Sequence, residues 1–165
     1  LKRANDAGYE VELLDLGNLR LDFADGRPAD QHDDDSARVL EVVSAADVVL
    51  LASPVYRGTY TGALKNLLDL LPLEALHAKP VGIIAMGAPQ HHYLGVDFHL
   101  RDVLAWFGAL VAPTSVYLAS SDFTDGKLNE SASTQLDELV STLGALAAVS
   151  RADISGPQPF AGKRG

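Results

Sequence analysis

The sequence contains no cysteine. Disulfide bonds, thiolate metal sites and catalysis by a thiol are therefore excluded. Basic residues are also scarce: 13 Lys and Arg stand against 22 Asp and Glu, which gives a formal net charge of -9 at pH 7. A chain with this balance lacks the clustered cations that bind a nucleic-acid backbone or an anionic membrane surface. We expect neither as a partner.

Long hydrophobic runs are missing too. Asp47 and Asp69 interrupt the longest apolar stretches, and none approaches the roughly 18 residues that suggest a membrane-spanning helix. No signal peptide is visible. With 47% hydrophobic and 21% charged residues, the 165 residues are typical of a single soluble domain, for which a cytoplasmic location is expected.

Several motifs that carry chemistry are absent as well. No strand pattern is followed by G-x-G-x-x-G, the fingerprint of dinucleotide-binding folds. The segment GPQPFAGKR near the C-terminus resembles a phosphate-binding loop only superficially, because Arg stands where Ser or Thr would bind magnesium. Without a G-x-S-x-G motif, Ser53 is a poor candidate for a hydrolase nucleophile.

Histidines and carboxylates give only weak metal signals. His91 and His92 could be joined by Asp97, but adjacent side chains point apart and no third ligand has a convincing spacing. A second cluster combines one histidine with four aspartates: Asp30, His32, Asp33, Asp34 and Asp35. It could hold a cation, but a solvated acidic loop that favours the positive end of the next helix is the stronger interpretation. We expect no metal site.

What the sequence does contain is a regular alternation of strand and helix patterns. Apolar runs predict strands at residues 9–16, 47–53, 80–87 and 111–120. Apolar residues at three- and four-residue steps predict helices at residues 36–46, 62–71, 93–108 and 133–149. Asp35 or Ser36 would cap the first of these helices. The alternation predicts one α/β domain over residues 1–150, with a parallel sheet between helical layers and a loose tail at 151–165.

Ligands bind to such sheets at the carboxyl ends of the strands. This rule selects the loops after Ser53, Gly87 and Ala119. It does not by itself say which ligand they bind.

The loop from Ser53 to Gly62 contains residues that restrict or free the backbone. Pro54 fixes one dihedral angle, and Gly58 permits a sharp turn or a close approach to a ligand. Tyr56 and Tyr60 offer flat, amphipathic surfaces. Two interpretations remain open: a strand-to-helix turn whose tyrosines cap the core, or a cradle for a flat heteroaromatic ligand.

The segments SPVYRGTYTGALKNLLDLLP and LEALHAKPVGIIAMGAPQHHYLGVDFHLRDVL carry a resemblance. They resemble the NAD(P)H-dependent FMN reductases with a flavodoxin-like fold, above all those that serve two-component alkanesulfonate monooxygenases. In the second segment the similar positions are Gly87, His92, Asp97 and Phe98. The resemblance covers about residues 9–120.

The resemblance implies a three-layer α/β/α fold with strand order 2-1-3-4-5. It also implies that the first strand and the phosphate-binding loop precede Leu1. The residues themselves point the same way, because 2–8 read as the end of a helix with Gly8 as its C-cap glycine.

Carried over position by position, the resemblance implies an FMN site at the first two loops. The residues that would hold the isoalloxazine ring are Pro54, Val55, Tyr56, Arg57 and Gly58, with Gly87 and Ala88 supporting its pyrimidine side through their backbone. No catalytic side chain is expected, because a flavin and a nicotinamide carry the hydride transfer themselves.

The expected function is NAD(P)H-dependent reduction of FMN, with electrons passing to free flavin, a quinone or another small acceptor. A flavin-dependent monooxygenase is a possible partner. The alternative is a flavodoxin-like electron carrier without NAD(P)H turnover. The resemblance also implies a homodimer or homotetramer. The helix at 93–108, which carries Trp106 and Phe107, could form that interface, or both aromatics could belong to the core.

Overall fold

The computed structural model describes residues 1–88, 93–150 and 156. At its centre is a parallel sheet formed by β1 (Val49–Pro54), β2 (Pro80–Gly87), β3 (Leu110–Val111) and β4 (Val116–Ala119). β2 is the central strand: β1 pairs along one side of it, and β3 and then β4 pair along the other. The predicted parallel α/β sheet is confirmed.

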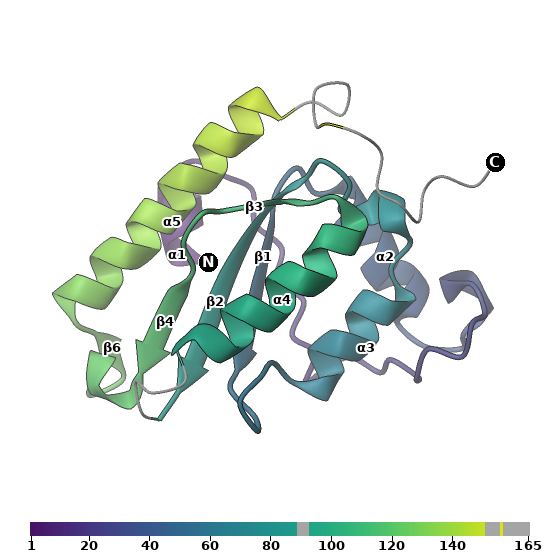
Figure 1. Cartoon of the computed structure of the whole chain (residues 1–165), viewed down its shortest axis with the longest axis horizontal. Coiled ribbons are helices and arrows are strands. Elements are labelled where there is room, and N and C mark those ends of the chain that lie inside the picture. The colour runs from purple at the N-terminus through teal and green to yellow at the C-terminus, as the bar shows by residue number, and fades with distance from the viewer. Residues whose placement is uncertain (89–92, 151–155, 157–165) are drawn as a thin grey trace.

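Helices cover both faces of this sheet, which makes three layers (Figure 1). One face is covered by α2 (Ser36–Ala45), α3 (Gly62–Leu70) and α4 (Tyr93–Phe107). The other carries α5 (Glu130–Val149), against which the short α1 (Lys2–Asp6) packs. The smaller elements are the 3-10 helices Ala29–Gln31, Leu73–Ala75 and Ser120–Asp122 and the hairpin strands β5 (Phe123–Thr124) and β6 (Lys127–Leu128).

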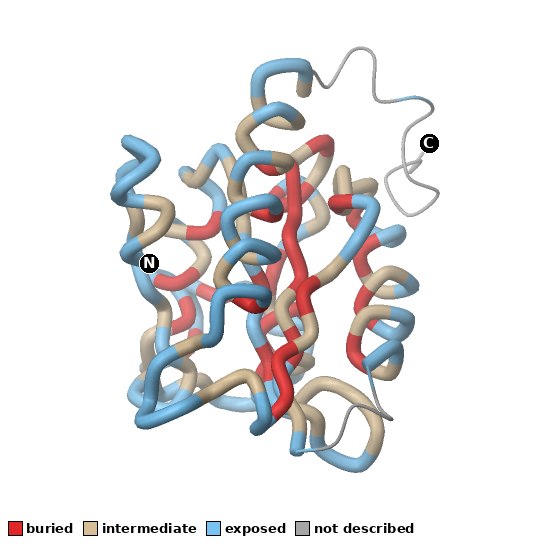
Figure 2. Tube along the Cα trace, turned by 90° about the vertical axis from the view of Figure 1, so that its left-hand side faces the viewer, coloured by how far each residue is buried: buried red, intermediate tan, exposed pale blue. Residues whose placement is uncertain are grey.

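Two hydrophobic cores lie on the two faces of the sheet, and buried segments follow the strands and the inner sides of the helices (Figure 2). The larger core joins α2, α3 and α4 to one face of β2, where Val81, Ile83 and Ala85 are buried. The smaller core joins α5 to β4 through Leu139 and Leu143. Alternation along β2 explains this division, because successive strand residues face opposite sides.

The predicted helices are confirmed with small shifts at their ends. The last helix begins at Glu130 rather than at residue 133, because the side chain of Asn129 accepts a hydrogen bond from Ala132 N–H (2.8 Å). At the chain start, α1 ends where expected, and Gly8 follows it with a φ of 88°. A glycine tolerates this left-handed conformation without strain.

The residues 17–35, here called the acidic loop, are fastened by their aspartates. The Asp34 carboxylate accepts hydrogen bonds from the backbone N–H groups of Asp22 (2.6 Å) and Ser36 (2.8 Å). Asp35, which occupies the N-cap position of α2, accepts instead from Arg20 N–H (2.8 Å). Burial raises the pKa of Asp34, but the hydrogen bonds from Asp22 and Ser36 outweigh that effect and lower it to about 2.

The predicted strand at residues 9–16 is wrong. These residues form no β-ladder with any part of the chain that the structure describes. Leu14 and Leu16 nevertheless pack against the larger core, so the apolar pattern reflects partial burial. A strand exists only by pairing with a neighbour, and among the described residues β1 pairs only with β2. The order of the three long strands matches the 3-4-5 part of the expected order.

The predicted strand at residues 111–120 is interrupted. β3 and β4 are separated by residues 112–115, which include Pro113. Proline has no N–H to donate to a ladder. The carbonyls of Ala112 and Pro113 turn instead to the guanidinium of Arg101, whose Nη2 donates to them at 2.8 and 3.1 Å.

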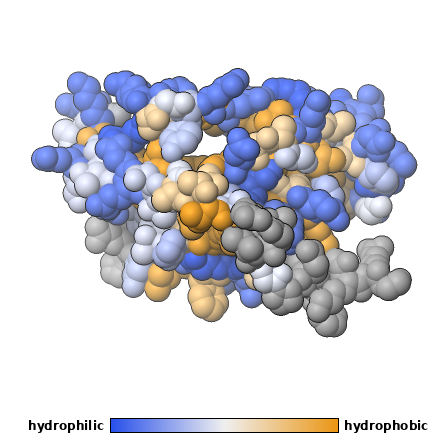
Figure 3. Space-filling model, turned by 90° about the horizontal axis from the view of Figure 1, so that it is seen from above, coloured by the Kyte–Doolittle hydropathy of each residue, from blue (hydrophilic) through white to orange (hydrophobic). Residues whose placement is uncertain are grey.

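The outer face of β1 is not covered within the described part of the chain. Leu50 is 41% exposed and Ala52 is also exposed, whereas the alternate residues Leu51 and Ser53 are buried. Because Leu50 pairs with Gly82, this exposed face is the one that α5 covers farther along the sheet. In the view from above, hydrophobic and hydrophilic residues together border an opening in the molecular surface (Figure 3).

Among the described residues, no helix is both long enough and apolar enough to traverse a bilayer. The predicted loose tail at 151–165 lies, apart from Gly156, outside the described residues.

Candidate functional site

The carboxyl ends of β1, β2 and β4 meet at one edge of the sheet. In the strand register, Pro54 lies beside Met86, and Gly87 lies beside Ala119. Val55 extends the pairing past the end of β1, since its N–H donates to the carbonyl of Met86 (2.7 Å). The segments after these three strands therefore begin side by side, as the topology rule predicts.

A tight turn forms the tip of the first loop. Tyr56 and Thr59 exchange two backbone hydrogen bonds of 2.9 and 3.2 Å. The two residues between them, Arg57 and Gly58, have φ angles of 55° and 82°. Two positive φ values in succession are typical of a type I′ turn, which suits glycine and strains most other residues. The backbone conformation of Arg57 and Gly58 thus determines the shape of this tip.

Ser53 closes the base of the loop. Its buried hydroxyl accepts a hydrogen bond from Thr61 N–H (3.0 Å) and donates one to the carbonyl of Pro54 (2.9 Å). Thr61 in turn caps α3, since its side chain accepts from Leu64 N–H (3.3 Å). Ser53, which the sequence makes a poor nucleophile candidate, is a structural clamp between β1 and α3.

Replacing this clamp should destabilise the protein. In Ser53→Ala, Thr61 N–H and the Pro54 carbonyl lose a partner inside a half-buried loop, which costs about 1–3 kcal/mol. We expect a lower urea midpoint with an unchanged denaturant slope. The control is Ser44→Ala, at an exposed serine near the end of α2, which should leave the midpoint in place. Equal midpoints for the two variants would contradict the clamp.

The two tyrosines of the loop have different environments. Tyr60 packs against the larger core, and burial raises the pKa of its hydroxyl above the ordinary value. Tyr56 is 64% exposed. Of the two interpretations left open by the sequence, core capping therefore applies to Tyr60, while Tyr56 leaves a free aromatic surface.

Helix α4 presses against the tip of the loop. A Cβ atom at Gly95 would lie closer than 3.0 Å to the carbonyl oxygen of Gly58, so only glycine fits there. His99, one turn farther along, has its Nδ1 at 2.8 Å from the hydroxyl of Thr59. The turn is therefore supported from the side by α4.

The second loop begins at Gly87, where neighbouring side chains fill the space that a side chain at residue 87 would need. A Cβ there would lie closer than 3.0 Å to the hydroxyl of Tyr117 and 3.4 Å from Val55 Cγ2. Gly87 thus lets β4 and the first loop close around the end of β2. Ala88, the next residue, is exposed.

The structure brings together Pro54, Val55 and Gly87, while Tyr56 and Arg57 are exposed nearby. Their role toward a flavin stays a prediction. Arg57 forms no ion pair with the described residues, so its charge is available to an anion.

Of the weak metal candidates, His91 and His92 lie outside the described residues. Asp97 is half-buried and accepts two hydrogen bonds from Arg101 Nε, at 2.9 and 3.1 Å. Since that arginine also holds the segment between β3 and β4, Asp97 has a structural role.

Sequence reasoning missed four residues that shape this site: Ser53 as a clamp, Gly95, His99 and Tyr117. Only Gly95 had a usable signal, because a glycine inside a helical pattern often marks a close approach. The others depend on contacts between distant segments.

The fold and the loop define the class: a three-layer α/β protein whose strand-end loops gather at the carboxyl edge of a parallel sheet, the edge at which such sheets bind ligands. Residues 1–124 match the family described as NADPH-dependent FMN reductase. The chain belongs to this family, which confirms the resemblance seen in the sequence.

Individual relatives agree with this assignment. The chain is 39% identical over 116 residues to an NAD(P)H-dependent FAD/FMN reductase of Geobacillus thermodenitrificans, covering 70% of this chain and 63% of that protein. It is 34% identical over 116 residues to the NADH-dependent FMN reductase SfnF of Pseudomonas fluorescens, covering 70% and 62%. The solved structure of an oxidoreductase from Corynebacterium diphtheriae superposes with a TM-score of 0.62 at 30% identity, covering 70% of this chain and 63% of that chain. The matches thus span just over three-fifths of these relatives.

Proposed function

We propose that the chain works as an NAD(P)H-dependent FMN reductase, which transfers hydride from a nicotinamide cofactor to FMN and passes electrons to free flavin, a quinone or another small acceptor. The observation that carries the proposal is the clamped loop from Ser53 to Gly62 at the carboxyl edge of the sheet, in a chain of the FMN reductase family.

The residues at this edge fit a flat ring. Tyr56 supplies an exposed aromatic surface, and the positive-φ turn at Arg57 and Gly58 has no side chain at its glycine, where the backbone can approach a ring. Gly87 and Ala88 would add backbone N–H groups on the pyrimidine side. Pro54 and Val55 would form the floor, since both lie at the end of β1.

FMN supplies the hydride-accepting ring when it is bound. The chain's own residues need only hold that ring, leave one side open for the nicotinamide and place backbone dipoles at the pyrimidine edge. None of the loop side chains is suited to act as a base at neutral pH: Ser53 is engaged in two hydrogen bonds, and burial keeps Tyr60 protonated. The exposed Arg57 would meet a phosphate of the nicotinamide cofactor.

Steady-state oxidation of NADH and NADPH by the full chain with added FMN tests the proposal. We expect turnover, and we expect Tyr56→Ala to weaken FMN affinity about tenfold, which corresponds to about 1.4 kcal/mol for a lost aromatic contact. The control is Phe23→Ala, at an aromatic that is 85% exposed in the acidic loop. FMN affinity is read from quenching of flavin fluorescence.

Two outcomes would count against the proposal. A flavin-loaded protein that oxidises neither nicotinamide would favour the alternative, a flavodoxin-like electron carrier. Equal FMN affinity in Tyr56→Ala and Phe23→Ala would remove Tyr56 from the site. The relatives include both NADH-dependent and NAD(P)H-dependent reductases, so both nicotinamides are tested.

We further propose that the chain works in the cytoplasm, with a flavin-dependent monooxygenase as a possible partner. We also propose that it forms a homodimer or homotetramer through α4. Phe107 is buried in the core, whereas Trp106 is 62% exposed. Tyr93, Leu94 and Phe98 are also exposed on this helix, which supports an apolar contact between copies. Sedimentation of a monomer at every concentration tested would overturn the dimer.

A further inference from the structure

His32 of the acidic loop is a buried polar side chain. Its side chain has 0% exposure, and within the described part of the chain neither Nδ1 nor Nε2 has a hydrogen-bond partner. Buried imidazole nitrogens normally find a partner, because an unpaired polar group away from water is costly. The two ring nitrogens are therefore available to a ligand.

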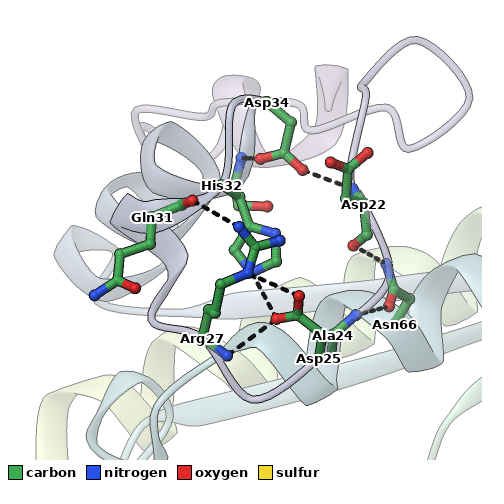
Figure 4. Close-up of polar contacts among 9 residues, drawn as sticks. Asp22, Ala24, Asp25, Arg27, Gln31, His32, Asp34 and Asn66 are labelled. Carbon is green, nitrogen blue, oxygen red and sulfur yellow. Dashed lines mark hydrogen bonds and ion pairs between the residues drawn. The ribbon is translucent and has the colours of Figure 1, made fainter.

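Three carboxylates lie near this ring, and two of them, those of Asp22 and Asp34, could share an ion with it. Ligand atoms of Asp22, His32 and Asp34 all lie within 4.8 Å of one another. Figure 4 shows the His32 side chain between those of Asp25 and Asp34, with Asp22 beside Asp34. The carboxylate of Asp22 has no hydrogen bond or ion pair in the described part of the chain. It is exposed and can move toward the ring.

The backbone around these ligands is held in place. Asn66 of α3 donates from Nδ2 to the carbonyl of Asp22 (3.0 Å) and accepts from Ala24 N–H (3.0 Å). Asp22 N–H donates to Asp34 (2.6 Å), which ties the two arms of the loop together. The three ligands thus come from two arms that are already joined, so an ion would need only small side-chain adjustments.

A protonated imidazole is the competing explanation. His32 Nε2 lies 3.6 Å from Asp25 Oδ1, close enough for an ion pair if the ring is charged. Asp25, however, is already engaged by Arg27, whose Nε donates to its Oδ2 at 2.7 Å. An ion pair with Asp25 would also involve Nε2 only, and it would leave Nδ1 without a partner among the described residues.

We propose that Asp22, His32 and Asp34 bind a divalent transition-metal ion of the zinc type, with water completing its coordination. One imidazole nitrogen and two carboxylate oxygens suit such an ion, whereas magnesium and calcium prefer oxygen ligands alone. Tetrahedral zinc ligands lie about 3.3 Å apart, given bond lengths of about 2.0–2.1 Å. The carboxylate of Asp34 can coordinate while accepting its amide hydrogen bonds, because each oxygen has two lone pairs.

The site lies in the acidic loop, in which no residue of the proposed flavin site occurs. Its predicted role is to fasten the two arms of the loop to each other, and its occupation does not depend on FMN.

Calorimetric titration of tag-free, metal-stripped full chain with Zn²⁺ tests the proposal, with Mg²⁺ as the comparison ion. We expect one saturable Zn²⁺ site, a rise in melting temperature on Zn²⁺ addition and no comparable response to Mg²⁺. Asp22→Asn and Asp34→Asn should each weaken Zn²⁺ binding at least about tenfold, the lower end of the loss seen when even an outer-shell partner of a metal is removed. Asp22→Asn is the cleaner of the two, since the Asp22 carboxylate forms no hydrogen bond with any residue that the structure describes.

The matched control is Asp33→Asn, an exposed aspartate of the same run that is outside the ligand set. It should retain the wild-type affinity. A double variant His91→Ala and His92→Ala should also retain it, which separates the site from the adjacent histidine pair. Absence of saturable binding, equal affinity in Asp22→Asn and Asp33→Asn, or loss of binding in the double histidine variant would each overturn the site.

Discussion

Gly95→Ala should destabilise the protein and weaken FMN binding, although the same substitution stabilises most helices. A Cβ at Gly95 would collide with the carbonyl oxygen of Gly58 and lie 3.2 Å from its carbonyl carbon. These are backbone atoms of a turn that two hydrogen bonds hold closed, so either α4 or the turn must move. We expect a loss of about 1–3 kcal/mol in the free energy of unfolding, as for other overpacked sites.

Gly62→Ala is the matched control. Gly62 also lies in the first turn of a helix, but a Cβ there meets nothing within 4 Å, and its φ is not in the left-handed region. The control should be neutral or stabilise by up to about 1 kcal/mol, the ordinary gain from replacing a helical glycine. Urea denaturation of both variants measures the difference, and quenching of flavin fluorescence reports on the turn. If both substitutions stabilised the protein, the close contact between α4 and the turn would be refuted.

Gly87→Ala should have an effect of similar size for a different reason. The new methyl group would occupy the position of the Tyr117 hydroxyl and touch Val55, so it would push β4 or the first loop away from the end of β2. The expected loss is again about 1–3 kcal/mol in the free energy of unfolding. Because Val55 and Gly87 belong to the proposed flavin site, FMN affinity should fall as well.

A second substitution can test which contact causes that loss. Tyr117→Phe removes the hydroxyl oxygen and leaves the ring carbon that lies 3.3 Å from the added Cβ. In the Gly87→Ala background it should restore part of the lost stability, whereas in the wild type it should not stabilise. The four proteins form a double-mutant cycle, and the coupling energy is expected at about 0.5–3 kcal/mol. A coupling energy of zero would show that Tyr117 does not fill the space at Gly87.

The central part of the fold could be predicted because its patterns are local. The apolar run at 80–87 is bounded by Pro80 and Gly87, and β2 has those bounds. The leucines of α3 repeat at helical spacing up to Pro72, which cannot continue a helix. Such signals need no knowledge of the rest of the chain.

The errors concern features that depend on neighbours. Residues 9–16 have the composition of a strand, but a strand also needs a paired neighbour, which composition does not reveal. Trp106 and Phe107 are adjacent on one helix and differ in burial, because helical rotation turns only Phe107 toward the core. The hairpin at β5 and β6 was overlooked despite its Asp125-Gly126 turn, a strong sequence signal for a type I′ hairpin.

The candidate site could be located from the sequence, but its construction could not. Topology alone selects the loops after Ser53, Gly87 and Ala119. The clamp at Ser53 and the support from His99 depend on hydrogen bonds across 8 and 40 positions of the chain. No local pattern contains that information.

The attachment of the loop at both ends has a kinetic consequence. Val55 is hydrogen-bonded to the end of β2 and Thr61 to Ser53, so the turn between them is tied to the sheet at both of its ends. A flavin bound at this turn, as proposed, would require no closing movement of the turn itself, and its exchange there would be governed by diffusion and contact strength. Rapid exchange suits the proposed reductase, whose product would be reduced flavin released into solution.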